Sequence, residues 1–263
     1  MTLPKLKHLG PEYGAQFSDP SVASAYRFRP SYPDEVYTIL ERLLGDTPRV
    51  VLELGCGLGE IARRLAPQTD RVDAVEPSHA MLELARMLPG GEHQNIQWYG
   101  CTAEEFTYMP GYGLVIAAES LHWMDWYYVL PAIRVSLSPH GRLVVLDRHL
   151  DTVPWWRALR PLIPLYSTNR DFQPYDLLGE LARRQLFHPE GRATTTPVLF
   201  SQAVEDYIES WHSRNGFSRD RMSASRALEF DARVREIVRP YAQAGFLRYE
   251  VQVELAWGVP NIV

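Results

Sequence analysis

Residues 50–60, which read VVLELGCGLGE, constrain the fold of this chain more than any other segment. An apolar run comes first, and glycines follow at alternate positions, namely Gly55, Gly57 and Gly59. Residues 61–66 then continue with the apolar spacing of an amphipathic helix. This order predicts a buried strand, a tight turn and the start of a helix. Because glycine has no Cβ atom, the backbone of the turn can approach a ligand closely.

The turn differs from two common phosphate-binding loops. A dinucleotide fingerprint needs glycine or alanine three residues after Gly57, where this chain has Glu60. A phosphate loop ends in Lys-Ser or Lys-Thr, and neither pair follows the glycines here. Glu53 beside the turn would repel a pyrophosphate, but it would attract a ligand that carries an ammonium and a sulfonium group. The segment therefore favours a cationic ligand.

Strand and helix patterns alternate after this segment, which predicts a parallel sheet covered by helices. Short apolar runs read as further strands at 71–76, 95–99, 114–118 and 142–147. Residues 78–85 read as a helix with Ser78 as its N-cap. Residues 151–192 then mix aromatic residues, prolines and arginines in a mainly helical pattern. Three elements are expected beyond them: a strand at 194–200, a long helix at 228–244 and an alternating, half-buried strand at 247–255.

The pattern at residues 53–59 resembles motif I of class I S-adenosylmethionine-dependent methyltransferases, E/D-x-G-x-G-x-G. The resemblance implies S-adenosylmethionine as the cofactor and S-adenosylhomocysteine as its product. It also implies a Rossmann-like, seven-stranded, mostly parallel sheet with helices on both faces, whose antiparallel last strand lies between strands five and six. The segment after strand five then becomes a helical cap over the carboxyl ends of the strands, where open α/β sheets bind ligands.

These expectations divide the chain into four parts. An N-terminal arm with a lid helix is expected at 1–45, and the cofactor-binding core at 46–150. The helical substrate cap follows at 151–192, and residues 193–263 complete the sheet and its helices.

Several residues are expected to hold the cofactor. Glu76 follows the second strand, where an acid can accept hydrogen bonds from both ribose hydroxyls, although it could instead be a solvated acid before a helix. Residues 101–106 resemble the family's G-x-A-E segment at the adenine, although Thr102 and Glu105 also fit a capping box. The expected set is Tyr26, Arg29, Glu53, Gly55, Cys56, Gly57, Glu76, Pro77, Met81, Ala103, Glu104 and Ala118.

Residues 117–125 follow strand four, where the family places the transferring methyl group. They lack the Asn/Asp-Pro-Pro motif of methyltransferases that act on base or glutamine amines, and the cysteine of cytosine C5 methyltransferases. The His122-Trp123 pair instead resembles small-molecule methyltransferases related to trans-aconitate methyltransferase. His122 is interpreted as a general base or as a positioning residue. The acceptor is expected against Phe17, Glu119, His122, Trp123, Trp155 and Trp156. Adjacent helical residues point about 100° apart, so at most one of the last two should face the pocket.

The N-terminal arm carries the same resemblance. Phe17, Tyr26 and the Arg-Pro-Ser-Tyr-Pro run at 29–33 match the F…Y-x-x-x-R-P-x-Y-P pattern that often opens family members. An aromatic ring near a sulfonium gains cation–π energy, and Arg29 can clamp a carboxylate with two hydrogen bonds. The alternative is that the prolines only shape the entry into a helix that begins near Asp34.

Composition limits the partners. The net charge of −5 argues against a nucleic-acid surface, and 2 cysteines give no disulfide framework. The N-terminus shows no signal-like apolar segment, and no apolar run approaches the roughly 20 residues of a membrane helix. We therefore expect a cytoplasmic enzyme without a metal that methylates a small molecule, with O-methylation favoured over N- or C-methylation. The open alternatives are a methyltransferase acting on RNA or protein, and a cofactor-binding subunit that does not methylate. The acceptor and the oligomeric state are not predicted.

Overall fold

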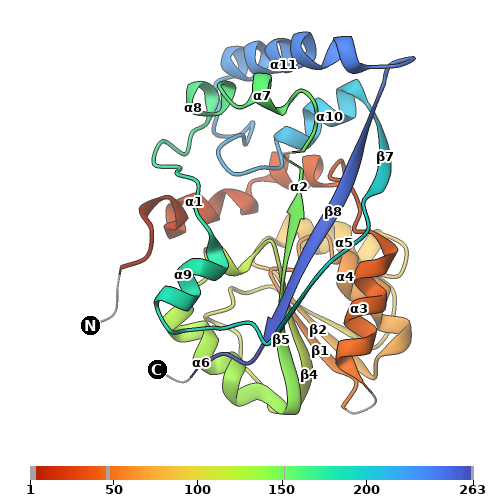
Figure 1. Cartoon of the computed structure of the whole chain (residues 1–263), viewed down its shortest axis with the longest axis vertical. Coiled ribbons are helices and arrows are strands. Elements are labelled where there is room, and N and C mark those ends of the chain that lie inside the picture. The colour runs from red at the N-terminus through yellow and green to blue at the C-terminus, as the bar shows by residue number, and fades with distance from the viewer. Residues whose placement is uncertain (1–3, 46–47, 151, 262–263) are drawn as a thin grey trace.

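A mostly parallel sheet forms the centre of the protein, whose computed structural model describes residues 4–45, 48–150 and 152–261 (Figure 1). The strands are arranged in the order β3-β2-β1-β4-β5-β8-β6, and neighbours among β1 to β5 are parallel. β8 runs antiparallel to both β5 and β6 and lies between them. This topology confirms the expected fold class. The strands are β1 Val50–Leu54, β2 Arg71–Val75, β3 Ile96–Tyr99, β4 Tyr112–Ala118, β5 Leu137–His149, β6 Gly191–Thr194 and β8 Phe246–Gly258.

An eighth strand, β7 Val198–Ala203, extends the expected set of seven. β8 is long enough to project beyond the sheet, so that its residues 252–258 pair with β5 while residues 246–251 pair with β7. Pairing with β7 satisfies backbone groups that the projecting half of β8 would otherwise leave open at an edge. The single strand expected at 194–200 is therefore the end of β6 and the start of β7.

Helices cover both faces of the sheet, because the side chains of each strand alternate between them. Val51 and Leu114 pack on one face beneath α3 Asp34–Leu44, α4 Glu60–Leu65 and α5 His79–Met87. Leu52 and Val115 pack on the other face beneath α6 Trp126–Ser136 and α9 Leu177–Arg183. Figure 1 shows these two helical layers on opposite sides of the strands.

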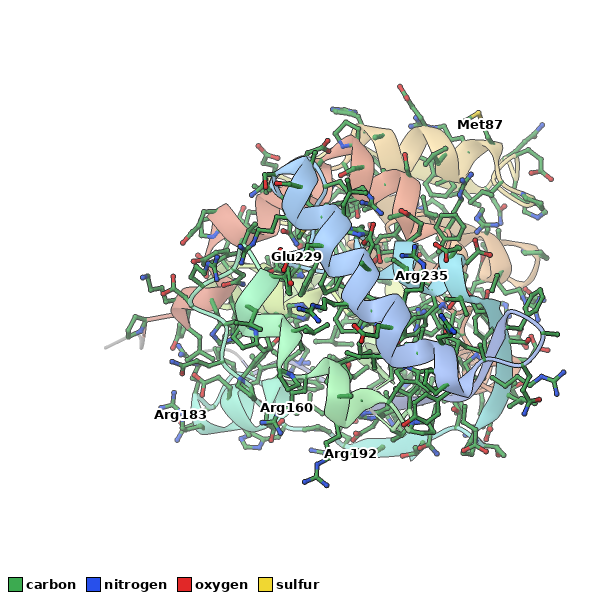
Figure 2. All side chains as sticks on the ribbon, turned by 90° about the horizontal axis from the view of Figure 1, so that it is seen from above. Met87, Arg160, Arg183, Arg192, Glu229 and Arg235 are labelled. Carbon is green, nitrogen blue, oxygen red and sulfur yellow. The ribbon has the colours of Figure 1, made fainter. Side chains whose placement is uncertain are left out.

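A helical cap with its own hydrophobic core lies beyond one end of the sheet (Figure 1). Its helices are α7 Trp156–Leu159, α8 Leu162–Tyr166, α10 Val204–Trp211 and α11 Ala224–Val238. In Figure 2, which is seen from above, α11 crosses the top of the molecule with Glu229 and Arg235 along it. The cap thus comes from two segments, one on each side of β6 and β7. This differs from the expected cap at 151–192: α9 packs on the sheet through Leu181, and the second half of the cap follows residue 193.

The N-terminal arm fills the space between the cap and the sheet (Figure 1). It contains α1 Pro11–Gly14 and α2 Pro20–Tyr26, and Val22 and Ala23 of α2 pack against Met81 of α5. The expected divisions at residues 46 and 151 begin at positions outside the described part of the chain. None of the helices in the described part has the length and apolar character that crossing a membrane requires.

Candidate active site

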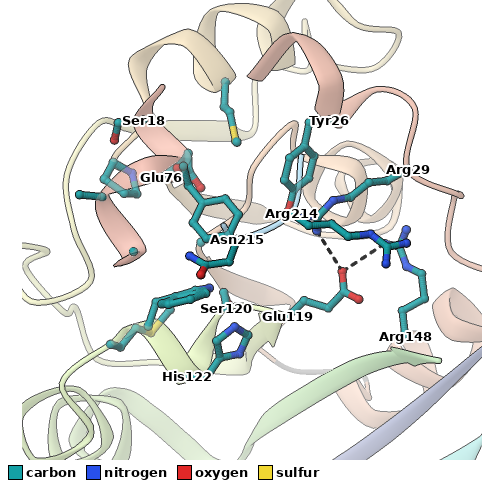
Figure 3. Close-up of a pocket in the computed structure, with 18 of the residues that line it drawn as sticks. Ser18, Tyr26, Arg29, Glu76, Glu119, Ser120, His122, Arg148, Arg214 and Asn215 are labelled. Atoms are coloured by element: carbon teal, nitrogen blue, oxygen red, sulfur yellow. Dashed lines mark hydrogen bonds and ion pairs between the residues drawn. The ribbon is translucent and has the colours of Figure 1, made fainter. Parts of the chain in front are cut away.

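A cavity of about 900 Å³ lies at the carboxyl ends of the parallel strands, under the arm and the cap (Figure 3). Gly55 follows β1, Glu76 follows β2 and Glu119 follows β4, and all three line the cavity. Tyr26 of the arm and Arg214, just after α10, complete it from the opposite side. Three layers of the protein therefore meet around one cavity, at the edge where open α/β sheets bind ligands.

Most of the residues expected at the site line this cavity. Those that do are Phe17, Tyr26, Arg29, Gly55, Glu76, Pro77, Met81, Ala103, Glu104, Glu119, His122, Trp123 and Trp156. The expected residues Glu53, Cys56, Gly57, Ala118 and Trp155 do not line it, and their surroundings are described below.

Glu76 presents a buried carboxylate to the cavity. Its side chain is only 5% exposed, and its two oxygens accept hydrogen bonds from the backbone N–H groups of Gly57 (3.0 Å) and Ser78 (2.9 Å). Burial raises the pKa of Glu76 above its usual value, and these two hydrogen bonds oppose the change. The possible reading of Glu76 as a solvated acid before a helix is therefore wrong.

Glu53 points away from the cavity. Its Oε2 accepts a hydrogen bond of 2.9 Å from the backbone N–H of Ala62, in the first turn of α4, and the residue is 2% exposed. This hydrogen bond satisfies one of the backbone N–H groups that have no partner within the helix at its first turn. The structure thus corrects the expected contact with the cofactor: Glu53 supports the glycine turn from behind.

Replacing Glu53 with glutamine is expected to make stability less dependent on pH. Burial raises the pKa of this carboxyl to about 8, against roughly 4.3 in an unfolded chain. The folded state therefore holds the proton more tightly, and ionisation costs stability increasingly as the pH rises between these two values. The variant cannot ionise, so its stability relative to the wild type should rise with pH by up to about 1.4 kcal/mol per unit. Urea unfolding at pH 5, 6.5 and 8 measures this, and parallel curves for the two proteins would contradict it.

Four further expected residues lie in packed surroundings. Cys56 belongs to the core beneath α3 and α4, and Ala118 packs against that core. Gly57 lies behind Tyr26, since a Cβ atom at Gly57 would come within 3.3 Å of the tyrosine ring. Trp155 is 1% exposed in the cap core, where its Nε1–H donates to the Tyr207 hydroxyl (2.8 Å). The expected acceptor contact of Trp155 is therefore wrong, while the neighbouring Trp156 lines the cavity.

The structure also contains the capping box expected as an alternative at residues 102–105 and the proline-led entry into the helix that begins at Asp34. Thr102 and Glu105 form the reciprocal capping box, with Thr102 N–H donating to Glu105 (3.0 Å) and Glu105 N–H donating to Thr102 (3.3 Å). Pro33 immediately precedes α3, so the proline-containing run does shape the entry into that helix. Each feature coexists with residues that line the cavity, namely Ala103 and Arg29.

Glu119 is the centre of a charged cluster at one end of the cavity (Figure 3). Its Oε2 lies 3.5 Å from Arg29 Nη1 and 3.7 Å from Arg148 Nη2. Burial would raise the pKa of Glu119, but Arg148 and Arg29 hold it below its usual value. Arg148 is itself fixed, because its guanidinium stacks at 4.0 Å on the ring of Tyr32 and donates to the carbonyl of Pro30.

Hydrogen bonds tie the arm to the segment after α10. Arg29 donates to the hydroxyl (2.8 Å) and to the carbonyl (2.7 Å) of Ser213. Asn215 donates to the carbonyl of Tyr13 (2.8 Å), and Gly216 N–H donates to Gln16 Oε1 (2.9 Å). The arm and residues 211–216 therefore form one continuous roof over the cavity.

His122 lines the cavity beside Trp123, with the two ring centroids 4.7 Å apart. Its imidazole makes no hydrogen bond to any residue in the described part of the chain. Burial lowers the pKa of His122 to about 3, although the nearby Glu119 raises it. The ring is therefore neutral at neutral pH, with one nitrogen able to accept a hydrogen bond from a ligand.

Comparison with known proteins identifies the family. A model of the methyltransferase domain matches residues 51–141. The chain is 35% identical over 201 residues to the uncharacterized methyltransferase Rv3342 of Mycobacterium tuberculosis, which covers 72% of this chain and 74% of that protein. This chain belongs to the class I S-adenosylmethionine-dependent methyltransferase family.

Further comparisons agree with this family. The methyltransferase is 28% identical over 118 residues to a ubiquinone biosynthesis O-methyltransferase of Histophilus somni, over 42% of this chain and 50% of that one. A solved structure of a putative type II methyltransferase from Anaeromyxobacter dehalogenans superimposes with a TM-score of 0.60 at 21% identity, covering 89% of this chain and 99% of that one. The second similarity supports the fold alone.

S-adenosylmethionine is the cofactor of this methyltransferase. The residues present fit that molecule. Each oxygen of Glu76 accepts one hydrogen bond from a backbone N–H. Each oxygen therefore has a second lone pair that can accept a hydrogen bond from a ribose hydroxyl. Gly55 adopts a positive φ of 70°, and a Cβ atom there would come within 2.6 Å of Ser120, so that this close turn requires glycine.

Among the residues that line the cavity of the methyltransferase and that sequence reasoning missed are Arg148, Arg214 and Asn215. Arg148 lies near the end of β5, and the rule that ligands bind at the carboxyl ends of strands could have found it. No comparable signal marks the other two. They follow a cap helix, and only the packing of that segment on the distant arm brings them to the cavity.

Proposed function

We propose that this methyltransferase transfers the methyl group of S-adenosylmethionine to an oxygen atom of a small-molecule acceptor. The observation that carries the proposal is the cavity of about 900 Å³, roofed by the arm and the cap. Binding sites for small molecules are commonly about 300–1,000 Å³ in volume, so one cavity of this size is suited to compact ligands. A polymer such as RNA would instead be expected to need an open, basic surface, whereas this chain has a net charge of −5.

Similarities of sequence support the same proposal. The arm motif and the His122-Trp123 pair resemble the small-molecule group related to trans-aconitate methyltransferase. The similar protein from Histophilus somni is named as an O-methyltransferase of ubiquinone biosynthesis. Two free cysteines, Cys56 and Cys101, are in keeping with the cytoplasmic location that forms part of the proposal.

The chemistry requires mainly positioning. Bound S-adenosylmethionine would supply a methyl group on a sulfonium: an acceptor oxygen in line with the sulfur–carbon bond would form the new O–C bond as the S–C bond breaks. S-adenosylhomocysteine would leave as a neutral thioether, and a hydroxyl acceptor would release its proton to solvent. Glu76 is proposed to fix the ribose end while the Tyr26 and Arg29 pair lines the other side. Holding two reactants in a productive geometry can replace a large part of the entropic barrier of a bimolecular reaction.

The proposed function is tested with cofactor labelled in the methyl group. The purified protein is incubated with labelled S-adenosylmethionine and a cell extract, and the products are separated by size and analysed by mass spectrometry. We expect the label in small molecules, attached to oxygen. Label in RNA or protein would overturn the small-molecule acceptor, and label on nitrogen or carbon would overturn O-methylation. Cofactor binding without any labelled product would indicate a subunit that does not methylate.

His122 is proposed to accept a hydrogen bond from the acceptor hydroxyl rather than to act as a strong base. General-base catalysis is most effective when the pKa of the base is near the working pH, and the pKa of His122 is lowered to about 3. We therefore expect His122→Gln to reduce turnover by less than about tenfold, well below the 10²–10⁴-fold typical of a lost base. Turnover measured against pH tests this. A limb near pH 6.5 that disappears in the variant would identify His122 as the base instead.

A further inference from the structure

Three arginines and one glutamate meet at the end of the cavity shown in Figure 3. Arg29 comes from the arm, Arg148 from β5 and Arg214 from the segment after α10. Among the described residues, Glu119 forms ion pairs with Arg29 and Arg148 and with no other side chain. Glu119 faces Arg29 and Arg148, and the carboxyl of Glu60 also acts on Arg148, so the positive charge left without a paired carboxylate is that of Arg214.

Protein partners hold two of the three guanidinium groups in place. Arg29 donates to Ser213 twice and to the Tyr26 hydroxyl (3.1 Å), in addition to its pairing with Glu119. Arg148 pairs with Glu119 and donates to the Pro30 carbonyl. Both groups are held in place by protein partners, although Arg148 Nε is buried without a hydrogen-bond partner in the described part of the chain.

Arg214 differs from both. Within residues 4–45, 48–150 and 152–261 its guanidinium forms no hydrogen bond and no ion pair, although it stacks at 4.1 Å on the ring of Trp211. Burial lowers the pKa of Arg214, and the Arg29 charge acts in the same direction, while Tyr207, Tyr249 and Glu119 oppose the change. Arg214 is partly buried and lines the cavity, so its five N–H donors are open to an acceptor on a ligand that displaces water.

The other carboxyl groups that line the cavity do not serve as that acceptor. Glu76 accepts from two backbone N–H groups, and Glu104 accepts from the backbone N–H of Asp125 (2.6 Å). Asp147 also lines the cavity, but burial raises its pKa and so disfavours its charged form. No carboxylate in the described part of the chain lies within 4.0 Å of Arg214.

The position of Arg214 is fixed in advance. Trp211, on which it stacks, is 2% exposed in the cap core. The residues on either side, Ser213 and Asn215, are hydrogen-bonded to the arm. An arginine held in this way loses little conformational entropy when it binds a ligand, which favours affinity.

We propose that Arg214 binds a carboxylate group of the methyl acceptor, so that this methyltransferase acts on small organic acids. The inference rests on the proposed function, because it assigns the chemical class of the same acceptor. A carboxylate fits better than a phosphate monoester, since one free guanidinium balances one negative charge, whereas a phosphate monoester carries about −1.5 to −2. The neighbouring Glu119 would repel the additional charge.

The proposal is tested with acid and amide pairs of nearly equal shape. Benzoate and benzamide, 4-hydroxybenzoate and 4-hydroxybenzamide, and succinate and succinamide are titrated by calorimetry into protein saturated with S-adenosylhomocysteine. We expect at least one acid to bind about 10- to 100-fold more tightly than its amide, as is typical of a charged hydrogen bond. Equal binding of acid and amide in every pair, including no binding of either, would overturn the proposal. Tighter binding of phenyl phosphate than of benzoate would overturn the choice of a carboxylate.

Variants assign the preference to Arg214. Arg214→Gln should abolish the difference between acid and amide, and Arg214→Lys, which keeps the charge but loses the planar fork, should retain part of it. Arg160→Gln is the matched control, because Arg160 is an exposed arginine of the cap (Figure 2) and should leave the preference unchanged. An acid preference that persists in Arg214→Gln would overturn the assignment. A loss of S-adenosylhomocysteine affinity in both Arg214 variants would show that Arg214 binds the cofactor instead.

These measurements are independent of turnover. Acid binding that depends on Arg214, without methyl transfer in the labelling assay, would refute the proposed function and leave the ligand class standing. Methyl transfer to a neutral acceptor with unchanged efficiency in Arg214→Gln would support the proposed function and refute the assignment of an organic acid as the acceptor.

Discussion

Replacing Glu76 with glutamine is expected to weaken the binding of S-adenosylhomocysteine by about 10- to 100-fold, which corresponds to the roughly 1.5–3 kcal/mol of hydrogen bonds to a charged group. The carboxylate of Glu76 accepts hydrogen bonds from two backbone N–H groups. Each of its oxygens has one further lone pair, which can accept a hydrogen bond from a ribose hydroxyl. The amide of glutamine replaces one of these oxygens with an NH₂ group. This donor would face the N–H donor of the backbone, with which it cannot form a hydrogen bond, or would leave a ribose hydroxyl without an acceptor.

Glu53→Gln is the matched control for this measurement. Glu53 and Glu76 are both buried carboxyl groups near the glycine turn, but only Glu76 lines the cavity. Isothermal titration calorimetry should show an affinity within about threefold of the wild type for Glu53→Gln, a difference of less than about 0.7 kcal/mol. Circular dichroism confirms that both variants are folded. Equal losses in the two variants would remove the proposed ribose contact.

Much of the sheet could be predicted from local sequence. The strands of the core are short apolar runs, each followed by turn residues, and this local pattern is what determines a buried parallel strand. β8 was recognisable because its residues alternate between polar and apolar. The sequence predicts one strand where the structure has β6 and β7. The break between them is not a local feature, because it depends on which part of β8 each strand pairs with.

The direction of Glu53 could also have been predicted. Side chains alternate along a strand, so Glu53 shares a face with Val51 and not with Leu52. Val51 lies in the core beneath α4, which is the face where the Glu53 carboxyl meets the helix. Resemblance to a motif assigned the residue to the ligand, whereas the periodicity of the strand assigns it to the helix.

The roof of the cavity could not be predicted in the same way. Arg214 reaches the cavity because α10 packs in the cap and because its neighbours bond to Tyr13 and Arg29 of the arm. These contacts join residues about 200 positions apart. No local pattern indicates such a pairing. The sequence predicts a cap at residues 151–192, where the composition is distinctive, but it does not predict the second half of the cap, which follows β7.

Replacing Glu119 with glutamine is expected to reduce the free energy of unfolding by about 2–4 kcal/mol at pH 7. Removing one partner of a buried ion pair typically costs about 3–5 kcal/mol, because it leaves a buried charge uncompensated, and the partial exposure of Glu119 lowers that figure. Arg148 has a side chain only 4% exposed, so water cannot replace the lost carboxylate. Glutamine rather than glycine is the right replacement, because Glu119 has a positive φ of 53° and glycine would also relieve backbone strain.

The effect should depend on pH with a definite sign. Arg148 and Arg29 hold the pKa of Glu119 below its usual value in spite of burial. The stabilisation is therefore fully present above the unfolded pKa of roughly 4.3, and it is lost as the pH falls through the lower folded value. Urea unfolding at pH 7 and at pH 3 should show the wild type and the variant converging in acid. A difference that stays constant would contradict the ion-pair origin of the effect.

Two comparisons isolate the pair. Glu236→Gln is the control, because Glu236 forms only an exposed pair with Arg233 at 3.6 Å, and such pairs contribute about 0–1 kcal/mol. In a double-mutant cycle of Glu119→Gln with Arg148→Met, the coupling energy should exceed about 1.5 kcal/mol, since residues in one ion-pair network do not act additively. Additive effects would mean that Glu119 stabilises the fold through Arg29, and that Arg148 is held by Tyr32 and Pro30 without Glu119.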